Sequence, residues 1–485
     1  GGLAVVQQPS GGEAHQRDRS GEDEEVVLQE HGPRGARPAG RGAGAQVEGR
    51  DELGTGGVRG HRGGAGGHGA DSTRRTIRAA RGLGLAVHLT DLPEALAAAP
   101  AVTALADRVT ALDHERPETC ARWARSGAAG PVRAVFSSRE YAQEGAAAVA
   151  AALGLPGNDP AVVATVRRKD RCRAALADAG FRQPAVRLCH DVRQAREFMT
   201  GRPGPFVVKP RDAMGSLGVA LVRTPGALDD AVTGLPGAGP FLIEEYVPGP
   251  EFSVEGVLTG GRPTVLAVTA KHVTPPPLFV ELAHALPAPV DPGVHHGLAR
   301  EAAAAVTALG LRHGVFHAEA WWTPDGPVLG EVHTRFGGDW IHLMLEHVLD
   351  ADVSAAVLRD LLGLPAADLA PVDPTAPGRG AAVLFPTPPP GRVAALHGWD
   401  RLTGLPGVLH ADPQLAPGDT VPPLTDSAAR RGVLVTAAED ARSALDLARR
   451  LAAGLGTTPV APAGPATAPD PSSPAPLRVR HQQEH

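Results

Sequence analysis

The chain has few of the residues that mark secreted, membrane or nucleic-acid-binding proteins. Only three of its 485 residues are cysteines, and their wide spacing argues against a disulfide framework or a zinc site and favours a reducing compartment, the cytoplasm. No run of about 18 apolar residues is present and the N-terminus lacks an apolar signal core, so neither a membrane span nor secretion is expected. A formal net charge of −6 gives no electrostatic basis for binding nucleic acid or an anionic membrane surface.

The rest of the composition is that of a globular protein with two to four domains. Hydrophobic residues make up 42% of the chain and charged residues 21%. Residues 1–71 differ, because they hold 20 of the 60 glycines and scarcely any apolar periodicity after Val27. We expect this leader to be disordered, or to be a misplaced start that replaces the first strand of the next domain. The tail, 457–485, is rich in Ala, Pro and Ser and is also expected to be disordered.

Helices and strands alternate over residues 72–158. A helix beginning near Thr76 ends at a glycine and is followed by a strand at 85–89, and a second apolar strand is predicted at 132–136. An Ala-rich helix at 144–153 ends before Gly154. This alternation predicts a small parallel α/β domain, and the absence of a GxGxxG loop argues against a dinucleotide site.

The segment 315–341 predicts a β-hairpin that carries several acidic and histidine residues. A Thr-Pro-Asp-Gly-Pro turn separates two β-type runs. If the hairpin folds symmetrically about the aspartate of this turn, Glu319 lies opposite Glu331 and His317 lies opposite His333. Alternation along each strand then places each His on the same face as the Glu two residues away.

The hairpin is predicted to be a metal-and-phosphate site. Glu319 and Glu331 would repel each other unless a cation lay between them, and Arg335 indicates an anion on the far side of that cation. The simpler interpretation is a solvated hairpin with cross-strand pairs, but apolar residues on both flanks argue against it. The register is an assumption, since a slip of one residue would send one strand's polar set to the opposite face.

Residues 206–222 predict two short strands joined by a glycine-containing loop. The first strand delivers Lys209, and the loop holds Gly215, Ser216 and Gly218. Glycine lets backbone N–H groups approach a phosphate, and the lysine adds a charge beside them. The loop matches neither a Walker A nor a Rossmann fingerprint, so an ordinary hairpin with an exposed lysine is the alternative. The preceding basic run around Lys169 is helical and is interpreted as a solvated helix face.

Two further segments carry candidate binding residues. Residues 241–258 end a strand with EEYV, whose backbone could meet a planar base while an acid binds a ribose hydroxyl, although an exposed sheet edge is an alternative. The Pro-rich loop after Lys271 holds Glu281 and His284, and a lone histidine there would more often be structural. Residues 351–362 predict an amphipathic helix ended by Gly363, and residues 378–455 predict a small α+β cap.

Taken in order, these segments resemble the ATP-grasp superfamily. The resemblance rests on a lysine at a helix start, FVVKP with GSLGV, IEEYVPGPEFSVEG, and a closing strand of the pattern E-x-[N/H]-x-R-x-G-G, and it covers roughly residues 76 to 455. FVELAHALPAP and the GDTVPPLTDSAARRGVLVTA block resemble the L-amino acid ligases. The implied fold is α/β and α+β: a Rossmann-like domain at 72–158, an ATP-grasp domain at 159–365, and a small C-terminal α+β ligase domain at 376–456.

The resemblance also implies roles for individual residues. Lys169 and Lys209 would contact ATP phosphates, and Glu319 and Glu331 would carry Mg²⁺. Arg335 would stabilise a phosphorylated intermediate, so that Arg335, Lys209 and Glu331 are the expected catalytic residues. The expected ATP contacts are completed by Gly215, Ser216, Gly218, Glu244, Glu245, Val247 and Glu251, and the expected substrate contacts are Glu281, His284, Arg335, Gly337 and Gly338.

His333 departs from the family pattern. Many relatives carry Asn at this position, and imidazole suits Mn²⁺ or zinc better than Mg²⁺. His333 is therefore only a secondary candidate for a metal ligand, with Mn²⁺ as the alternative ion, and a hydrogen bond to phosphate or substrate is its other expected role. His317 is expected to orient the metal ligands from behind.

The implied function is an ATP-dependent carboxylate–amine ligase that joins two small molecules, expected to be amino acids, through an acyl phosphate and releases ADP and phosphate. Phe279, Trp322, Phe336 and Trp340 are candidates for setting substrate preference. Homodimers are common in this superfamily, so a homodimer is one expectation. The alternatives are another ATP-grasp enzyme (carboxylase-like, purine-pathway ligase or small-molecule kinase) or a nucleotide-binding regulator without turnover.

Overall fold

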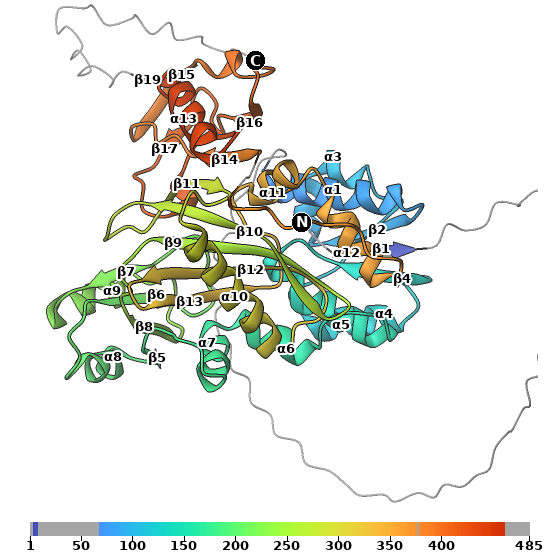
Figure 1. Ribbon diagram of the computed structural model, residues 1–485, viewed down its shortest axis with the longest axis horizontal. Helices are drawn as coiled ribbons and strands as arrows, with labels where there is room; N and C mark the ends of the chain where they lie inside the picture. Colours follow the sequence, from blue (N-terminus) through green and yellow to red (C-terminus); the bar gives the residue numbers. More distant parts are fainter. Residues whose placement is uncertain (1–2, 8–66, 376–377, 461–485) are drawn as a thin grey trace, which may run out of the picture.

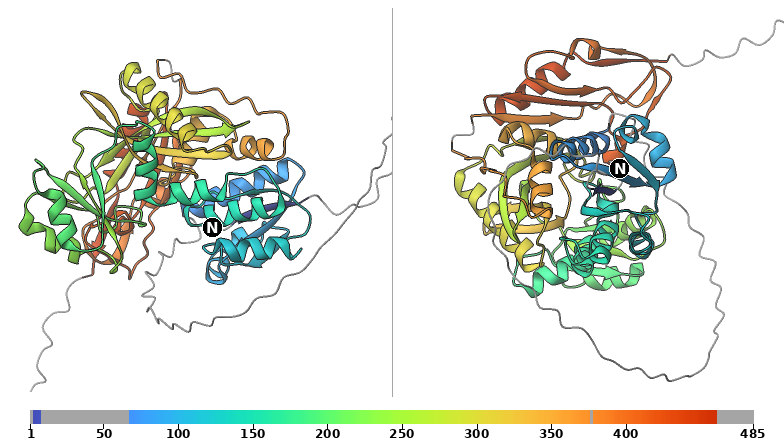
Figure 2. Two further views of the ribbon diagram at one scale, coloured as in Figure 1. Left: turned by 90° about the horizontal axis from the view of Figure 1, so that it is seen from below. Right: turned by 90° about the vertical axis from the view of Figure 1, so that its right-hand side faces the viewer.

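The computed structural model describes residues 3–7, 67–375 and 378–460 (Figure 1). An N-terminal domain lies beside a large central sheet, a smaller sheet lies across the central sheet, and the C-terminal elements extend from the sheet's far edge. Figure 2 shows the N-terminal domain packed against the helices that follow the central hairpin. Buried residues of α1, β2, α11 and α12 form one hydrophobic core across this junction.

The N-terminal domain is built on a mixed four-stranded sheet of order β3-β2-β1-β4. β2 and β3 are parallel, whereas β1 is antiparallel to both of its neighbours. The predicted helix at 144–153 is confirmed, and Gly154 ends it in the left-handed conformation with φ 65°. The elements are β1 (Leu3–Gln7), α1 (His68–Gly82), β2 (Ala86–Asp91), α2 (Pro93–Ala98), α3 (Pro100–Thr103), β3 (Arg108–Ala111), α4 (Pro117–Arg125), β4 (Val132–Phe136), η1 (Glu140–Ala142) and α5 (Gln143–Leu153).

Both ends of the expected leader differ from the prediction. Leu3–Gln7 form the inner strand β1, and α1 begins at His68, before the predicted boundary at residue 72. Residues 3–7, which the prediction included in the glycine-rich leader, therefore supply strand β1 of this sheet. The remainder of that expected leader, residues 8–66, lies outside the described residues.

A small antiparallel sheet of order β5-β8-β6-β7 forms one wall of the central cleft. β8 lies between two strands, so the interpretation of residues 241–245 as an exposed edge is wrong. Asp159 and Asp191 cap the helices that follow them through bonds to backbone N–H groups. The elements are α6 (Pro160–Arg167), α7 (Lys169–Asp178), β5 (Val186–Cys189), α8 (Val192–Met199), β6 (Phe206–Pro210), β7 (Ala220–Val222), η2 (Pro225–Ala227), α9 (Leu228–Thr233) and β8 (Phe241–Glu245).

An eight-stranded antiparallel sheet of order β13-β12-β9-β10-β11-β14-β18-β16 forms the opposite wall. The C-terminal region is continuous with it, because β14 pairs with β11 and β18 pairs with β14. The predicted helix at 351–362 is present as α12. The elements up to α12 are β9 (Glu251–Thr259), β10 (Arg262–Val273), β11 (Glu281–Leu286), α10 (Pro292–Ala308), β12 (Gly314–Thr323), β13 (Gly326–His333), α11 (Ile341–Leu349) and α12 (Val353–Leu361).

The C-terminal region adds a second, three-stranded sheet of order β17-β15-β19 and the helix α13, which packs on β14 and β18. Residues 457–459 lie in β19 and so do not belong to the expected tail, whose residues from 461 lie outside the described part of the chain. The elements are β14 (Gly380–Leu384), β15 (Gly391–His397), η3 (Trp399–Arg401), β16 (Val408–Asp412), β17 (Thr420–Val421), η4 (Ser427–Ala429), β18 (Val433–Ala438), α13 (Ala441–Ala452) and β19 (Gly456–Pro459).

The β12–β13 hairpin contains a bulge that decides which residues face the cleft. Near the turn, Thr323 pairs with Gly326, so the register there is shifted by one residue from the predicted symmetric one. Further along, His317 pairs with His333 as predicted, because Glu319 faces two residues, Gly330 and Glu331. Without the bulge, the register of the turn would send Glu331 to the opposite face of the sheet.

A group of charged side chains joins α1 to α11. Arg75 pairs with Asp71 at 2.6 Å and with Glu346 at 2.7 Å, and His342 Nε2 lies 3.1 Å from Asp71. Burial raises the pKa of Glu346 to about 7, against the opposing charge of Arg75.

This shift predicts a pH dependence of stability. An acid whose pKa is higher in the folded state contributes stability that is complete below its unfolded pKa, near 4.5, and is lost as the pH rises towards about 7. We expect the difference in unfolding free energy between the wild type and Glu346→Gln to fall by on the order of 1–3 kcal/mol between pH 4.5 and 8. Urea unfolding at both pH values measures it, with exposed Glu94→Gln on α2 as the matched control. An unchanged difference would contradict the assignment.

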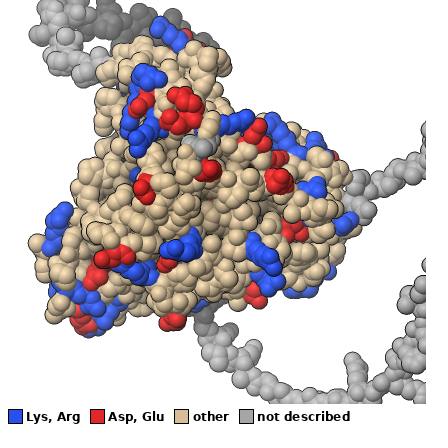
Figure 3. Space-filling view, viewed as in Figure 1, with Lys and Arg blue, Asp and Glu red and all other residues tan. Residues whose placement is uncertain are grey.

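The described helices include none with the length and apolar character needed to cross a bilayer. On the face shown in Figure 3, Lys and Arg side chains are interspersed with Asp and Glu, and no broad surface of one sign is visible there.

Candidate active site

A cleft with an empty volume of about 1010 Å³ lies between the small sheet and the large sheet. Most of the predicted binding residues meet here although they come from six strands (β6, β8, β9, β11, β12 and β13), the start of α7 and the loops that follow β6, β8 and β13. The charged and small residues that line it include Lys169, Lys209, Gly215, Ser216, Glu244, Glu245, Val247, Glu251, Lys271, Glu281, Glu319, Glu331, His333 and Arg335.

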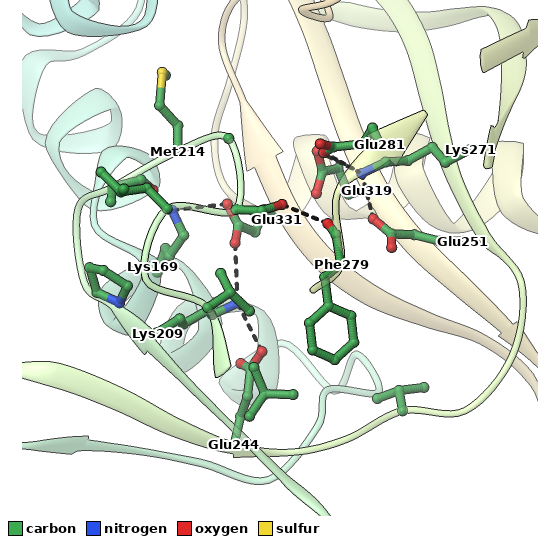
Figure 4. Close-up of a pocket in the computed structure, with 18 of the residues that line it drawn as sticks. Lys169, Lys209, Met214, Glu244, Glu251, Lys271, Phe279, Glu281, Glu319 and Glu331 are labelled. Carbon is green, nitrogen blue, oxygen red and sulfur yellow. Dashed lines mark hydrogen bonds and ion pairs between the residues drawn. The ribbon is translucent and has the colours of Figure 1, made fainter. Parts of the chain in front are cut away.

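Two lysines from the small-sheet side converge on Glu331 (Figure 4). Lys169 Nζ lies 3.1 Å from one carboxylate oxygen of Glu331 and Lys209 Nζ lies 3.2 Å from the other. Burial raises the pKa of Glu331, but the charges of both lysines outweigh it and hold this pKa well below its usual range. Lys209 is only 7% exposed, so the interpretation of an ordinary hairpin with an exposed lysine is wrong.

Glu319 belongs to a second cluster, centred on Lys271 of β10. Lys271 Nζ lies 3.3 Å from Glu319 and 3.8 Å from Glu281, and it forms a short ion pair with Glu251 (Figure 4). Burial is the largest influence on the pKa of Glu251 and raises it. Burial is also the largest single influence at Glu319, but Lys271 and His317 together outweigh it and hold the pKa of Glu319 well below its usual range. Lys271 is a site residue that the sequence interpretation did not select, and its position opposite His284 is visible only in the folded sheet.

A buried arginine supports the lysine side of the cleft. Arg173 of α7 is 2% exposed, and its Nη2 lies 3.0 Å from Glu244, whose other oxygen lies 2.8 Å from Lys209. The basic run around Lys169 is therefore not a solvated helix face, since both Lys169 and Arg173 point inward. Glu244 therefore links Lys209 to the buried Arg173 and holds the Lys209 side chain in position.

We expect Arg173→Met to lower the unfolding free energy by ~3–5 kcal/mol, because it leaves Glu244 in a buried position with only one of its two cations. Chemical unfolding in urea measures this loss. The matched control is Arg171→Met on the same helix, where the arginine is exposed and the expected change is below ~1 kcal/mol. Equal changes for the two variants would contradict the structural role of the buried pair.

The N-terminal domain contributes one carboxylate to the site. Glu140, at the start of η1, accepts a hydrogen bond from Arg335 Nε at 2.7 Å, and its same oxygen lies 3.1 Å from His333 Nδ1. Burial raises the pKa of Glu140, but its contacts with His333, Arg335 and Arg167 together outweigh burial and hold that pKa well below its usual range. Arg335 also donates to the carbonyl of Phe336 at 2.8 Å. Sequence reasoning missed Glu140, because nothing near it in the chain marks it as a site residue.

The glycine loop between β6 and β7 covers the cleft from one side. Gly215, Ser216 and Gly218 have φ values of 67°, 59° and 69°, a left-handed conformation that is costly for Ser216. Ser216 Oγ donates to the carbonyl of Phe279 at 2.7 Å. Of the three predicted loop residues, Gly215 and Ser216 line the cleft and Gly218 does not, and contact of this loop with a phosphate stays a prediction.

Three predicted substrate residues lie outside the set that lines the cleft: His284, Gly337 and Gly338. His284 is 2% exposed, and its Nε2 lies 3.1 Å from Asp339. This is a structural contact, the alternative to a substrate contact that a lone histidine in this segment offered. A Cβ at Gly337 would lie within 3.0 Å of His317 and Ile341, so this glycine permits close packing behind the site.

The aromatic candidates are also divided by the structure. Phe279 lines the cleft, whereas Trp322, Phe336 and Trp340 do not and pack in the two large hydrophobic cores. Trp321, the neighbour of Trp322, is the tryptophan that faces the cleft. Because adjacent strand residues point to opposite faces, only one tryptophan of the pair could do so.

The carboxylates present fit a magnesium ion that takes the rest of its ligands from a bound nucleotide. Glu319 and Glu331 lie on neighbouring strands and face the same cleft, and Mg²⁺ is commonly held by one or two carboxylates together with phosphate oxygens and water. Among the described residues there is no group of three His, Cys, Asp or Glu side chains arranged for a metal. His333 has its Nδ1 engaged by Glu140, and its Nε2 lies 3.6 Å from Glu331.

Comparison with known proteins gives two family matches and several relatives. Residues 202–342 match the ATP-grasp domain, and residues 384–456 match the L-amino acid ligase C-terminal domain 2. Carnosine synthase 1 of Gallus gallus is 32% identical over 358 residues, which are 68% of this chain and 36% of that protein. The chain therefore spans about a third of the length of that relative.

Two further relatives are similar over a larger share of their length. An uncharacterized protein of Sinorhizobium fredii, y4rH, is 26% identical over 335 residues, 68% of each chain. The crystal structure of L-amino acid ligase from Bacillus licheniformis superposes with a TM-score of 0.67 at 22% identity, covering 80% of this chain and 96% of that one. This likeness establishes a shared fold.

Proposed function

Because this chain is an ATP-grasp protein whose C-terminal region is of the L-amino acid ligase type, we propose that it is an ATP-dependent carboxylate–amine ligase. The observation that carries the proposal is the meeting of Lys169, Lys209 and the glycine loop with the paired carboxylates Glu319 and Glu331 in one cleft. The proposed substrates are ATP and two small molecules, a carboxylate and an amine, both amino acids.

The proposed reaction has two steps. A carboxylate does not condense with an amine in neutral water because its oxygen is a poor leaving group. Transfer of the γ-phosphoryl group of ATP to that oxygen gives an acyl phosphate and ADP. The amine then attacks the acyl carbon, the bond to the phosphorylated oxygen breaks, and phosphate leaves.

The residues of the cleft match the demands of these steps. Lys169, Lys209 and Gly215 line the cleft, and we assign the two lysines to hold phosphates in line and the loop of Gly215 and Gly218 to exclude water from the intermediate. Arg335, oriented by Glu140, offers a guanidinium fork to the acyl phosphate. Glu244 to Val247 and Glu251 are the proposed contacts of adenine and ribose, and Glu281 is the proposed contact of an amino-acid substrate.

Glu319 and Glu331 are the proposed magnesium ligands, with His333 as a secondary candidate that would favour Mn²⁺. A bound divalent ion would neutralise charge that develops on the phosphate oxygens. Lys169 and Lys209 lie against Glu331, and Lys271 lies against Glu319; these positive charges favour the ionised carboxylates that a divalent cation requires. The three cysteines are free and buried, which is compatible with the proposed location in the reducing cytoplasm.

The proposal is tested by incubating the chain with ATP, Mg²⁺ and pairs of amino acids and identifying the nucleotide product. ADP and phosphate that appear only with suitable pairs, together with an amide product, are the expected result. Hydroxylamine should trap the activated carboxylate as a hydroxamate, whereas a small-molecule kinase would give a stable phosphorylated product. AMP and pyrophosphate, or ATP binding with no turnover across a broad panel, would overturn the ligase assignment. Light scattering tests the proposed homodimer.

A further inference from the structure

A short turn of the C-terminal region reaches the rim of the cleft. This turn, residues 426–430, contains η4 and contacts the glycine loop directly: the backbone N–H of Ser427 donates to the carbonyl of Gly215 at 3.0 Å. The hydroxyl of the same Ser427 forms a short hydrogen bond with the carboxylate of Glu281. One residue therefore touches both the phosphate side and the substrate side of the cleft.

The turn is held firmly against the large sheet. Arg430 pairs with both carboxylate oxygens of Asp339 at 2.6 and 2.7 Å, and donates to the carbonyl of Glu281 at 3.0 Å. Its guanidinium also lies 3.8 Å from the ring centroid of Phe385. Asp426 caps the turn by accepting from the backbone N–H of Ala429 at 3.0 Å. These contacts make the turn a fixed support for whatever bonds to Ser427.

The tip of the glycine loop depends on such supports. Lys169 Nζ donates to the carbonyl of Ala213 at 2.7 Å, Ser216 Oγ donates to Phe279, and Ser427 donates to Gly215. Lys169 also pairs with Glu331, so a phosphate would have to share the three N–H donors of this lysine with Ala213 and Glu331. The bond from Ser427 comes instead from the C-terminal region and uses no group that is proposed to bind the nucleotide.

We infer that residues 426–430 act as a latch that holds the tip of the glycine loop over the cleft and links its position to Glu281. Ser427 and Arg430 are then positioning residues: they act through Gly215 and Glu281. This inference rests on the proposed nucleotide role of the loop. Its consequence is that loss of the latch lets the loop open while ATP is bound, so that water reaches the activated carboxylate and ATP is consumed without amide formation.

The backbone bond is separated from the side-chain bond by two variants, Ser427→Pro and Ser427→Ala. Ser427 is the first residue of η4, where proline is tolerated, and Asp426 before it is extended with φ −156° and ψ 175°, as a residue before proline must be. Proline removes both the N–H donor and the hydroxyl, whereas alanine removes only the hydroxyl. Comparing Pro with Ala therefore isolates the bond to Gly215.

Amide hydrogen exchange of residues 211–219 in the protein without nucleotide measures the latch itself. We expect exchange in this loop to be about fivefold faster in Ser427→Pro than in Ser427→Ala, the effect of losing one hydrogen bond. In turnover, Ser427→Pro should raise the ratio of ADP to amide, and Ser427→Ala should raise the KM for the substrate at Glu281 while leaving loop exchange unchanged.

Equal loop exchange in the two variants would overturn the latch, whatever the activity. Faster exchange in a protein that forms no amide with any substrate would retain the latch and refute the ligase. If thermal unfolding shows that Ser427→Pro does not fold, Arg430→Gln takes its place, since it loosens the turn and leaves Ser427 intact. Unchanged loop exchange in Arg430→Gln would then overturn the inference.

Discussion

Replacing Arg335 with Lys is expected to lower turnover ~10²-fold or more, the loss seen when one donor to a developing oxyanion is removed. Arg335 is held by Glu140 at its Nε and by the carbonyl of Phe336 at Nη1, which leaves the other edge of the guanidinium for the cleft. Lysine keeps the charge but has no planar fork, so it cannot serve Glu140 and a phosphoryl group together. Steady-state ADP formation with the identified substrate pair measures the effect.

The control for this substitution is Arg379→Lys, because Arg379 forms an exposed pair with Asp350 at 3.0 Å, remote from the residues that line the cleft. Its turnover should equal that of the wild type. Near-normal turnover in Arg335→Lys would show that the guanidinium geometry is not needed and would remove Arg335 from the catalytic residues. Glu140→Gln tests the residue that orients Arg335. We expect a smaller loss of turnover, on the order of 10–100-fold, as for residues that orient a ligand.

Glu331→Gln is expected to have two separate effects. It removes the carboxylate that neutralises Lys169 and Lys209, so the unfolding free energy should fall by ~3 kcal/mol or more, as when one partner of a buried ion pair is deleted. It also removes one of the two proposed magnesium ligands, so ADP formation should fall at least ~10²-fold and require more Mg²⁺ for half-maximal rate. Urea unfolding and a Mg²⁺ titration of the rate measure the two effects independently.

Glu197→Gln on α8 is the matched control, since Glu197 lies on the surface and pairs with Arg193 of the same helix. Its stability should change by less than ~1 kcal/mol and its Mg²⁺ dependence should not change. If Glu331→Gln retained the wild-type Mg²⁺ dependence while losing stability, Glu331 would be a structural counter-ion for the lysines and the metal assignment would be wrong.

The sequence by itself determined the local elements that carry several of the site residues: a strand, a glycine loop, a helix end and a hairpin. Lys209 and the glycine loop follow from an apolar strand that ends at Pro210, and Gly154 ends α5 because glycine accepts a left-handed φ at no cost. The β12–β13 hairpin follows from turn residues between two apolar runs, whereas its His317–His333 pair depends on the bulge. Each of these signals lies within a few residues of the structure that it predicts, so periodicity and turn chemistry are sufficient to read it.

The tertiary structure decided which side chains share the cleft. Glu140 reaches Arg335 from 195 residues away, and Lys271 meets Glu319 through a sheet whose strand order cannot be read from any one strand. The bulge at Gly330 turns Glu331 to the cleft, and a Cβ there would lie 3.1 Å from the carbonyl of Glu319. Pairings between distant segments are fixed by how whole sheets and domains pack, and local sequence carries little record of them.

The C-terminal region illustrates the same division. Its strands and its helix α13 were foreseeable from short apolar runs and glycine or proline turns, yet an independent cap was expected. In the structure β14 and β18 continue the central sheet, and Ser427 bonds to Gly215 at the rim of the cleft. Strand edges are alike in sequence whether they are exposed or paired, because backbone hydrogen bonding is the same for every residue except proline. Only the folded chain reveals that this region completes the rim of the site.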